Sequence, residues 1–175
     1  MKRSKHRWQA GFAAFLCALG SMAANADRQA NDQNFVSQAT QAGIVEVELG
    51  KIAQTKATDA DVRTFASRMV ADHSKANEEL AALVQGHDID VPSTLDADHR
   101  KIVTAVSAET GADFDAAYSK QTAADHAAVV DLFRSAAASN DLSPALSNFA
   151  SETIPTLEDN KHVADDLAAK AGHGY

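Results

Sequence analysis

The sequence predicts an all-α protein, a four-helix bundle with one short extra helix. Two observations support this fold class. Helix-forming residues, above all alanine, dominate the chain, and long alternating runs of β-branched residues are missing. In four long segments, apolar residues recur at steps of three and four, which is the period of a helix that buries one face.

The first two long helices are expected at 32–57 and 58–85. Thr58 and Asp61 have the spacing of a capping box, which would begin the second helix. So short a connection makes the two helices antiparallel neighbours. The expected apolar stripes comprise Phe35, Ala39, Ala42, Leu49 and Ala53 on the first helix, and Val62, Phe65, Ala66, Met69, Ala76, Leu80 and Leu83 on the second.

The second half of the chain is expected to contain one short and two long helices. A loop with a proline leads into the short helix at about 95–109, and a glycine separates it from a long helix at 113–139. The last helix is expected at 143–170, because Ser143-Pro144 combines a capping residue with proline at the first helical position. Pro155 is expected to kink or break this helix.

Residues 1–26 have the three parts of a secretory signal peptide. An apolar run at 11–19 is too short to cross a bilayer as a helix, and small residues at 24–26 suit cleavage after the last of them. The only cysteine, Cys17, lies within this segment, so the mature chain, 27–175, is expected to be a single cysteine-free domain that is periplasmic or secreted. The cationic start consists of Lys2, Arg3, Lys5 and Arg7.

The mature chain is strongly acidic. Removing the signal peptide takes four of the 16 Lys and Arg residues and no acidic residue, which leaves 12 basic against 24 acidic groups and a net charge of −12 with His neutral. Nucleic acids and anionic membranes are bound through excess Lys and Arg, so both are excluded as expected partners. The charge suits a cationic partner or simple solubility. No later segment is apolar enough for a transmembrane anchor, and nothing indicates an oligomeric state.

Each long helix carries one polar residue on its apolar stripe. Glu46 follows Ala39 by seven positions on the first helix, and His73, His126 and Asn160 take equivalent places on the other three. Burying a carboxyl group and two imidazoles costs free energy unless they are paired or bound to something. The predicted interior is therefore the candidate site.

Two interpretations of these four residues remain open. One carboxylate and two imidazoles, completed by the Asn160 amide or water, would suit a single first-row transition metal. Alternatively the four form a structural hydrogen-bond network, in which His73 or His126 donates to Glu46. No haem-attachment motif, phosphate-binding loop or nucleophile elbow is present.

Several stretches resemble the family catalogued as domain of unknown function 4142. The second-helix stretch is the most specific, and the resemblance covers nearly all of residues 32–171. The matching residues are Phe35-Val36, Ala42-Gly43, Glu46 to Gly50, Val62, Phe65 to His73, Ala76, Leu80, Phe114-Asp115, Tyr118, Gln121, His126, Leu132-Phe133, Phe149-Ala150 and Thr153 to Leu157.

The resemblance implies an exported bacterial protein with a ferritin-like helical fold and no established activity. The family motif tends to carry a His five residues after the fourth-helix proline, where this chain has Asn160. A di-iron ferritin site is not expected, because such sites need several Glu ligands and Glu-x-x-His motifs. Here one carboxylate faces the interior, and neither His73 nor His126 has an acidic residue three positions before it.

Two functions follow from these observations. The first is a non-enzymatic binding module, stress-related by family association, whose polar core is structural. The second is a small metalloprotein, a metal carrier or weak redox enzyme, that uses Glu46, His73 and His126. A haem held by the two histidines is less favoured, because the core is rich in alanine and poor in aromatic residues.

Overall fold

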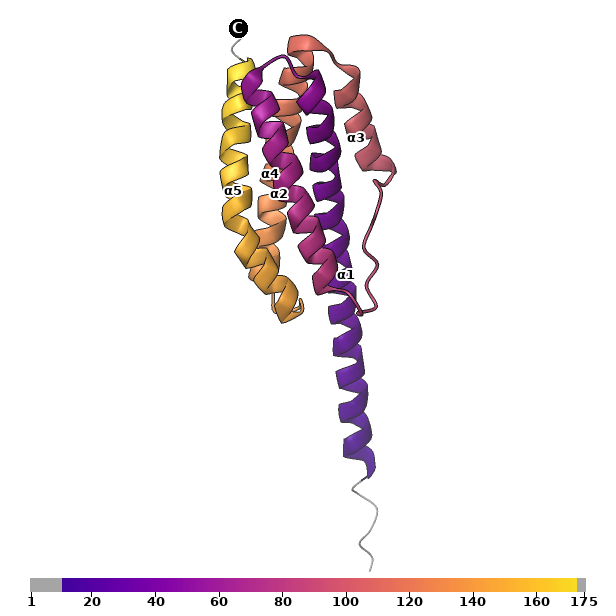
Figure 1. Ribbon diagram of the computed structural model, residues 1–175. Helices are drawn as coiled ribbons and strands as arrows, with labels where there is room; N and C mark the ends of the chain where they lie inside the picture. Colours follow the sequence, from indigo (N-terminus) through magenta and orange to yellow (C-terminus); the bar gives the residue numbers. More distant parts are fainter. Residues whose placement is uncertain (1–10, 173–175) are drawn as a thin grey trace, which may run out of the picture.

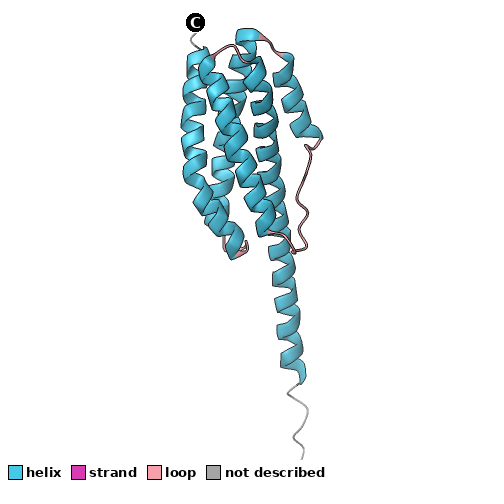
Figure 2. Ribbon diagram, in the orientation of Figure 1, coloured by secondary structure: helices cyan, strands magenta, loops and turns pink. Residues whose placement is uncertain are grey.

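The computed structural model describes residues 11–172, with side chains described from residue 25 onward. This part of the chain forms five helices and no strand (Figures 1 and 2), which confirms the all-α prediction. None of the described helices is both long and apolar enough to span a membrane. The helices are α1 (Gly11–Lys56), α2 (Ala60–Leu83), α3 (Ala97–Ala108), α4 (Gly111–Ala137) and α5 (Pro144–Gly172).

The bundle consists of two helical hairpins. The most extensive contacts join α1 to α2 and α4 to α5, and each pair is linked by a short turn. The segment 84–96 and the short helix α3 run back along the bundle to join the two hairpins (Figure 1). One long crossover of this kind is the connectivity of ferritin-like bundles. It brings four long helices around one interior.

Helix α1 begins much earlier than the residue 32 start expected from its apolar stripe. The segment 23–31 contains no glycine or proline that would end a helix. Side chains of 25–31 are exposed, and Asp32 is the first buried residue among those described. The first part of α1 extends beyond the other helices in Figure 1. The packed bundle therefore involves α1 only from about residue 32.

Two glycines allow α1 and α2 to pack closely. A Cβ atom at Gly43 would lie 2.3 Å from the Asn77 side-chain oxygen. At Gly50 it would lie 3.0 Å from the backbone oxygen of Ala66. A larger residue at Gly50 would therefore press on the backbone of α2, whereas at Gly43 the Asn77 side chain would have to move. These glycines flank Glu46 and bring it against α2.

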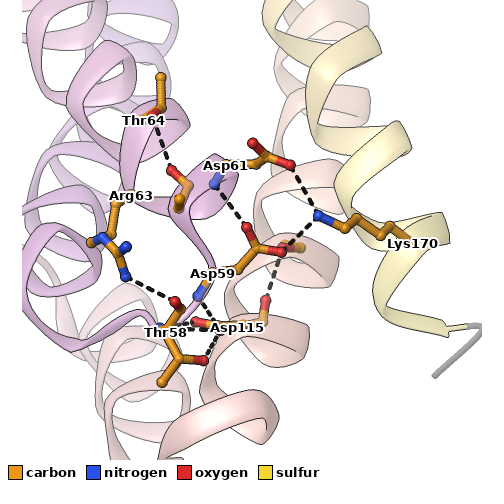
Figure 3. Close-up of polar contacts among 9 residues, drawn as sticks. Thr58, Asp59, Asp61, Arg63, Thr64, Asp115 and Lys170 are labelled. Carbon is orange, nitrogen blue, oxygen red and sulfur yellow. Dashed lines mark hydrogen bonds and ion pairs between the residues drawn. The ribbon is translucent and has the colours of Figure 1, made fainter. Parts of the chain in front are cut away.

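The turn between α1 and α2 is held by a buried carboxylate of α4 (Figure 3). Asp115 accepts hydrogen bonds from the backbone N–H groups of Thr58 and Asp59, at 3.0 and 2.9 Å, and from the Thr58 hydroxyl. Asp59, and not Thr58, caps α2 by accepting from the Asp61 N–H at 2.7 Å. The Thr58 cap prediction is therefore wrong. Lys170 of α5 pairs with Asp59 and Asp61 across the same end of the bundle.

The remaining helix boundaries lie within two residues of those expected, and two details of the helices differ from the sequence pattern. Helix α2 ends at Leu83, which is 38% exposed, and Val84 takes the buried position four residues after Leu80. Helix α5 continues through Pro155 without a break, and Figure 1 shows a bend between its orange and yellow parts. A proline removes one helical hydrogen bond and crowds the preceding turn, which accounts for bending without termination.

Glutamine side chains of α1 fix the crossover segment. Gln33 exchanges two hydrogen bonds with the backbone of Asp90, of 2.8 and 2.7 Å. Gln41 binds the Thr94 carbonyl at 2.9 Å and the Asp96 N–H at 3.1 Å. A segment without regular structure needs such partners for its backbone polar groups. These contacts hold the crossover along α1.

Candidate metal centre

Four buried polar side chains, here called the polar layer, lie across the bundle: Glu46 on α1, His73 on α2, His126 on α4 and Asn160 on α5. None is more than 5% exposed. The structure therefore places in the interior all four residues that the sequence pattern assigned to buried stripes. Each of the four long helices contributes one of them.

The polar layer divides the hydrophobic core into two clusters. Apart from Val45, which adjoins Glu46, the buried apolar residues before the polar residue of each long helix belong to one cluster and those after it to the other. Hydrophobic packing on both sides keeps solvent from the polar layer, so its groups depend on other protein groups, or on a bound ligand, for partners. The first cluster includes Leu49, Met69, Tyr118 and Ala164, and the second includes Ala39, Leu80, Val129 and Leu157.

The two histidines contact each other directly. The Nε2 atoms of His73 and His126 lie 3.3 Å apart, and the rings meet edge to face at an interplanar angle of 77°. The Nδ1 of His126 lies 3.0 Å from the Thr122 carbonyl oxygen, which only accepts. His126 is therefore protonated on Nδ1, and its Nε2 lone pair faces His73. Two nitrogens this close leave no room for a porphyrin between them.

Glu46 is fully buried, and both of its carboxyl oxygens are without a hydrogen-bond partner among the described groups. Its closest approach to a histidine is 3.6 Å, from Oε1 to the Nδ1 of His126, which is too long for a hydrogen bond. That Nδ1 proton is directed to Thr122 instead. Burial, and secondarily the nearby Asp125, raise the pKa of Glu46 well above its usual value.

These three side chains can converge on one metal ion. Donor atoms of Glu46, His73 and His126 lie within 4.8 Å of one another, and no other set of three such residues in the described part of the chain comes as close. With metal–nitrogen bonds of about 2.1 Å, nitrogens 3.3 Å apart subtend about 104°, close to the tetrahedral angle. A small movement of the carboxylate would complete a three-ligand site.

Asn160 enters the polar layer in a defined orientation. Its Nδ2 donates to Asp72 at 3.1 Å, while its Oδ1 is buried and has no partner among the described residues. Asp72 lies beside His73 in the chain but at the edge of the bundle, where Arg68 pairs with it at 3.3 Å. As the residue next to His73 on a helix, Asp72 projects about 100° away from it, and the structure connects Asp72 to the interior through Asn160.

Three further residues of α4 lie near the site and were not among the candidate ligands of the sequence analysis. Thr122 supplies the carbonyl that fixes His126. Tyr118 is buried and Asp125 is half-buried, and this burial raises the pKa of each. Tyr118 and Thr122 lie eight and four positions before His126, so the helical period could have placed them on the same face. Asp125 gives no such signal, because its burial depends on the packing of neighbouring elements.

We expect the metal-free protein to lose stability in acid through His73. Burial, and then the neighbouring His126, lower the pKa of His73 to about 3, against about 6.5 in an unfolded chain. The unfolded state therefore binds a proton that the folded state does not. This contribution to stability is present above about pH 6.5 and is lost as the pH falls towards 3, by at most about 1.4 kcal/mol per pH unit.

Urea unfolding with a chelator, measured between pH 7 and pH 4, would test this expectation. The free energy of unfolding of the matched variant His73→Gln should fall less as the pH is lowered. This variant lacks the imidazole that takes up a proton on unfolding and keeps every other titratable group. Glu46 acts in the opposite direction, since its raised pKa stabilises the fold below about pH 4.5 and less as the pH rises. Equal pH dependence in both proteins would contradict the assignment to His73.

The fold and the site together define a class: an all-α bundle of two hairpins, joined by one long crossover, with a buried Glu-His-His cluster. The chain belongs to the family described as domain of unknown function (DUF4142), whose family model matches residues 18–167. Comparison with curated proteins and with solved structures finds no match. The family assignment agrees with the resemblance seen in the sequence, and the family's description names no activity.

Proposed function

We propose that this protein is an exported helical bundle that binds a single first-row transition metal through Glu46, His73 and His126. The observation that carries the proposal is the Glu46 carboxyl group, which is fully buried with both oxygens unpartnered. A buried polar group without a partner costs about 1–3 kcal/mol. A metal ion would give this carboxylate a ligand bond and neutralise its charge.

The histidine geometry supports the same proposal. The hydrogen bond from His126 to the Thr122 carbonyl leaves Nε2 free for a metal, which is how metal-binding histidines are commonly oriented. Without metal, the His73 Nε2 proton satisfies this lone pair. Metal binding would move that proton to the other ring nitrogen of His73 or release it, and would release the Glu46 proton.

A purely structural network accounts less well for these contacts. That interpretation requires a histidine to donate to Glu46, yet the available donor of His126 binds Thr122 and the histidines pair with each other. The proposed activity is binding, and no catalytic step is assigned. The acidic mature chain would also raise the local concentration of cations.

Export rests on the N-terminal sequence. A cationic start, a short apolar run and small residues before Asp27 are the features that export machinery recognises. An exported protein would meet metal ions outside the cytoplasm, where it is loaded after or during folding. The mass of protein recovered from the exported fraction of a bacterial host should correspond to a chain beginning at Asp27.

Elemental analysis of this exported protein, purified without a histidine tag, tests metal binding. We expect near-stoichiometric iron, zinc, manganese or copper in the parent, and loss of metal in His73→Ala and His126→Ala that keep their helical circular dichroism. His162→Ala is the matched control, because His162 is exposed and pairs only loosely with Asp166 at 3.9 Å. A metal-free parent, or metal retained in both core variants, would refute the proposal.

A further inference from the structure

The contacts of Asn160 suggest a fourth metal ligand, together with a neighbouring residue that holds its side chain in place. The side-chain amide can be placed with either its oxygen or its nitrogen towards a neighbour, and only the hydrogen-bond network decides. Here the neighbour is Asp72, whose carboxylate is paired with Arg68 and can only accept. The nitrogen of Asn160 must therefore face Asp72, and the oxygen must face away from it.

The oxygen of Asn160 is buried within the bundle, on the side of the amide away from Asp72. Asn160 is completely buried, and its Oδ1 has no hydrogen-bond partner within the described chain. Along α5, Asn160 lies between Leu157 of one hydrophobic cluster and Ala164 of the other. It thus occupies the same level of the bundle as Glu46 and the two histidines. An unpartnered acceptor at this level is suited to a cation.

We propose that Asn160 Oδ1 is the fourth ligand of the metal and that Asp72 is the residue that positions it. This inference rests on the proposed metal site. Arg68 supports the arrangement from the surface, with its Nε 3.3 Å from Asp72 and its Nη2 3.0 Å from Asp159. The chain Arg68–Asp72–Asn160 links the solvent-exposed edge of α2 and α5 to the polar layer.

The arrangement has a consequence for the metal that is bound. Two imidazoles, one carboxylate and one amide oxygen form an N₂O₂ set without sulfur, which suits divalent first-row ions such as zinc, iron, cobalt or Cu(II) and does not favour soft Cu(I). An amide oxygen adds no charge, so the ligand set carries a single negative charge from Glu46. A second-sphere residue that orients such a ligand commonly contributes about 10- to 100-fold in metal affinity.

Titration of the metal-free protein with Co²⁺, followed by its visible absorption, tests the inference. We expect Asp72→Ala to weaken Co²⁺ binding by about 10- to 100-fold and to change the absorption band, because the freed amide can rotate. Asp72→Asn is the matched variant: its side-chain oxygen can still accept from Asn160, so affinity and spectrum should stay near those of the parent. Asn160→Ala should reproduce the effect of Asp72→Ala.

The double variant separates positioning from a general loss of stability. If Asp72 acts through Asn160, adding Asp72→Ala to Asn160→Ala should cause no further loss of Co²⁺ affinity. A purely structural Asp72 would lower the free energy of unfolding and leave affinity and spectrum unchanged, which would overturn the inference alone. A parent protein that binds no Co²⁺, and no other metal on elemental analysis, would overturn the proposed function together with it.

Discussion

Replacing Glu46 by methionine is expected to stabilise the metal-free protein, by about 1–3 kcal/mol, while abolishing metal binding. The carboxyl group is fully buried and neither oxygen has a partner among the described groups, so its desolvation is uncompensated. Methionine has a similar volume and fits irregular gaps in a core. Exchanging a buried ionisable group for a well-packed apolar one is often neutral or stabilising.

Thermal unfolding in the presence of a chelator would measure this effect. For a domain of this size, each 1 kcal/mol corresponds to about 2–4 °C in Tm. Glu46→Gln is the matched control: it keeps the shape and the polarity, so it should weaken metal binding without the gain in stability. Adding metal should reverse the order, because a ligand at about 1,000 times its Kd stabilises the parent by about 4.1 kcal/mol, more than the expected gain from the substitution, and leaves Glu46→Met unaffected.

The sign of the Glu46→Met effect distinguishes the two interpretations of the polar layer. In a structural network the carboxyl group is a hydrogen-bond partner, and its removal leaves a buried histidine unpaired and destabilises the fold. At a metal site the same carboxyl group destabilises the metal-free fold and stabilises the metal-bound fold. A clear loss of stability in metal-free Glu46→Met would therefore favour the network and count against the metal centre.

The sequence predicts the fold and the polar layer because both depend on the helical period. Glu46, His73, His126 and Asn160 each lie at a multiple of three, four or seven residues from apolar neighbours, so one helix at a time determines their direction. The number of long helices follows from the same pattern. Helix ends were less predictable: Leu83 fits the stripe of α2, but the helix ends there and the side chain is exposed.

Contacts between helices could not be predicted from the period. The direct pairing of His73 with His126, and the absence of a partner for Glu46, depend on how α1, α2 and α4 are rotated against one another. Asp72 shows the same limit, because it reaches the interior only through a residue 88 positions away. A single sequence specifies which face of each helix is buried, whereas side-chain partners across helices require the packed structure.

A second large effect on stability is expected at the end of the bundle that carries the α1–α2 turn, far from the polar layer. Replacing Asp115 by alanine should destabilise the protein by about 2–4 kcal/mol, a fall in Tm of roughly 5–15 °C. The Asp115 side chain is 1% exposed and accepts from two backbone N–H groups and one hydroxyl of the α1–α2 turn. Hydrogen bonds to a charged acceptor are worth about 1.5–3 kcal/mol each, and solvent reaching Thr58 offsets part of their loss.

Chemical denaturation of three variants would test how much the hydrogen bonds of Asp115 to the α1–α2 turn contribute to stability. Asp115→Asn keeps one acceptor oxygen and should lose less than Asp115→Ala, and Thr58→Val removes only the hydroxyl contact and should cost about 1 kcal/mol. Folded Asp115→Ala should still bind metal, because 11 residues of α4 separate it from His126, about 16 Å along the helix. If Asp115→Ala proved as stable as the parent, the α1–α2 turn would not depend on α4. Loss of metal at full stability would instead couple the turn to the site, which the separation of the two regions does not predict.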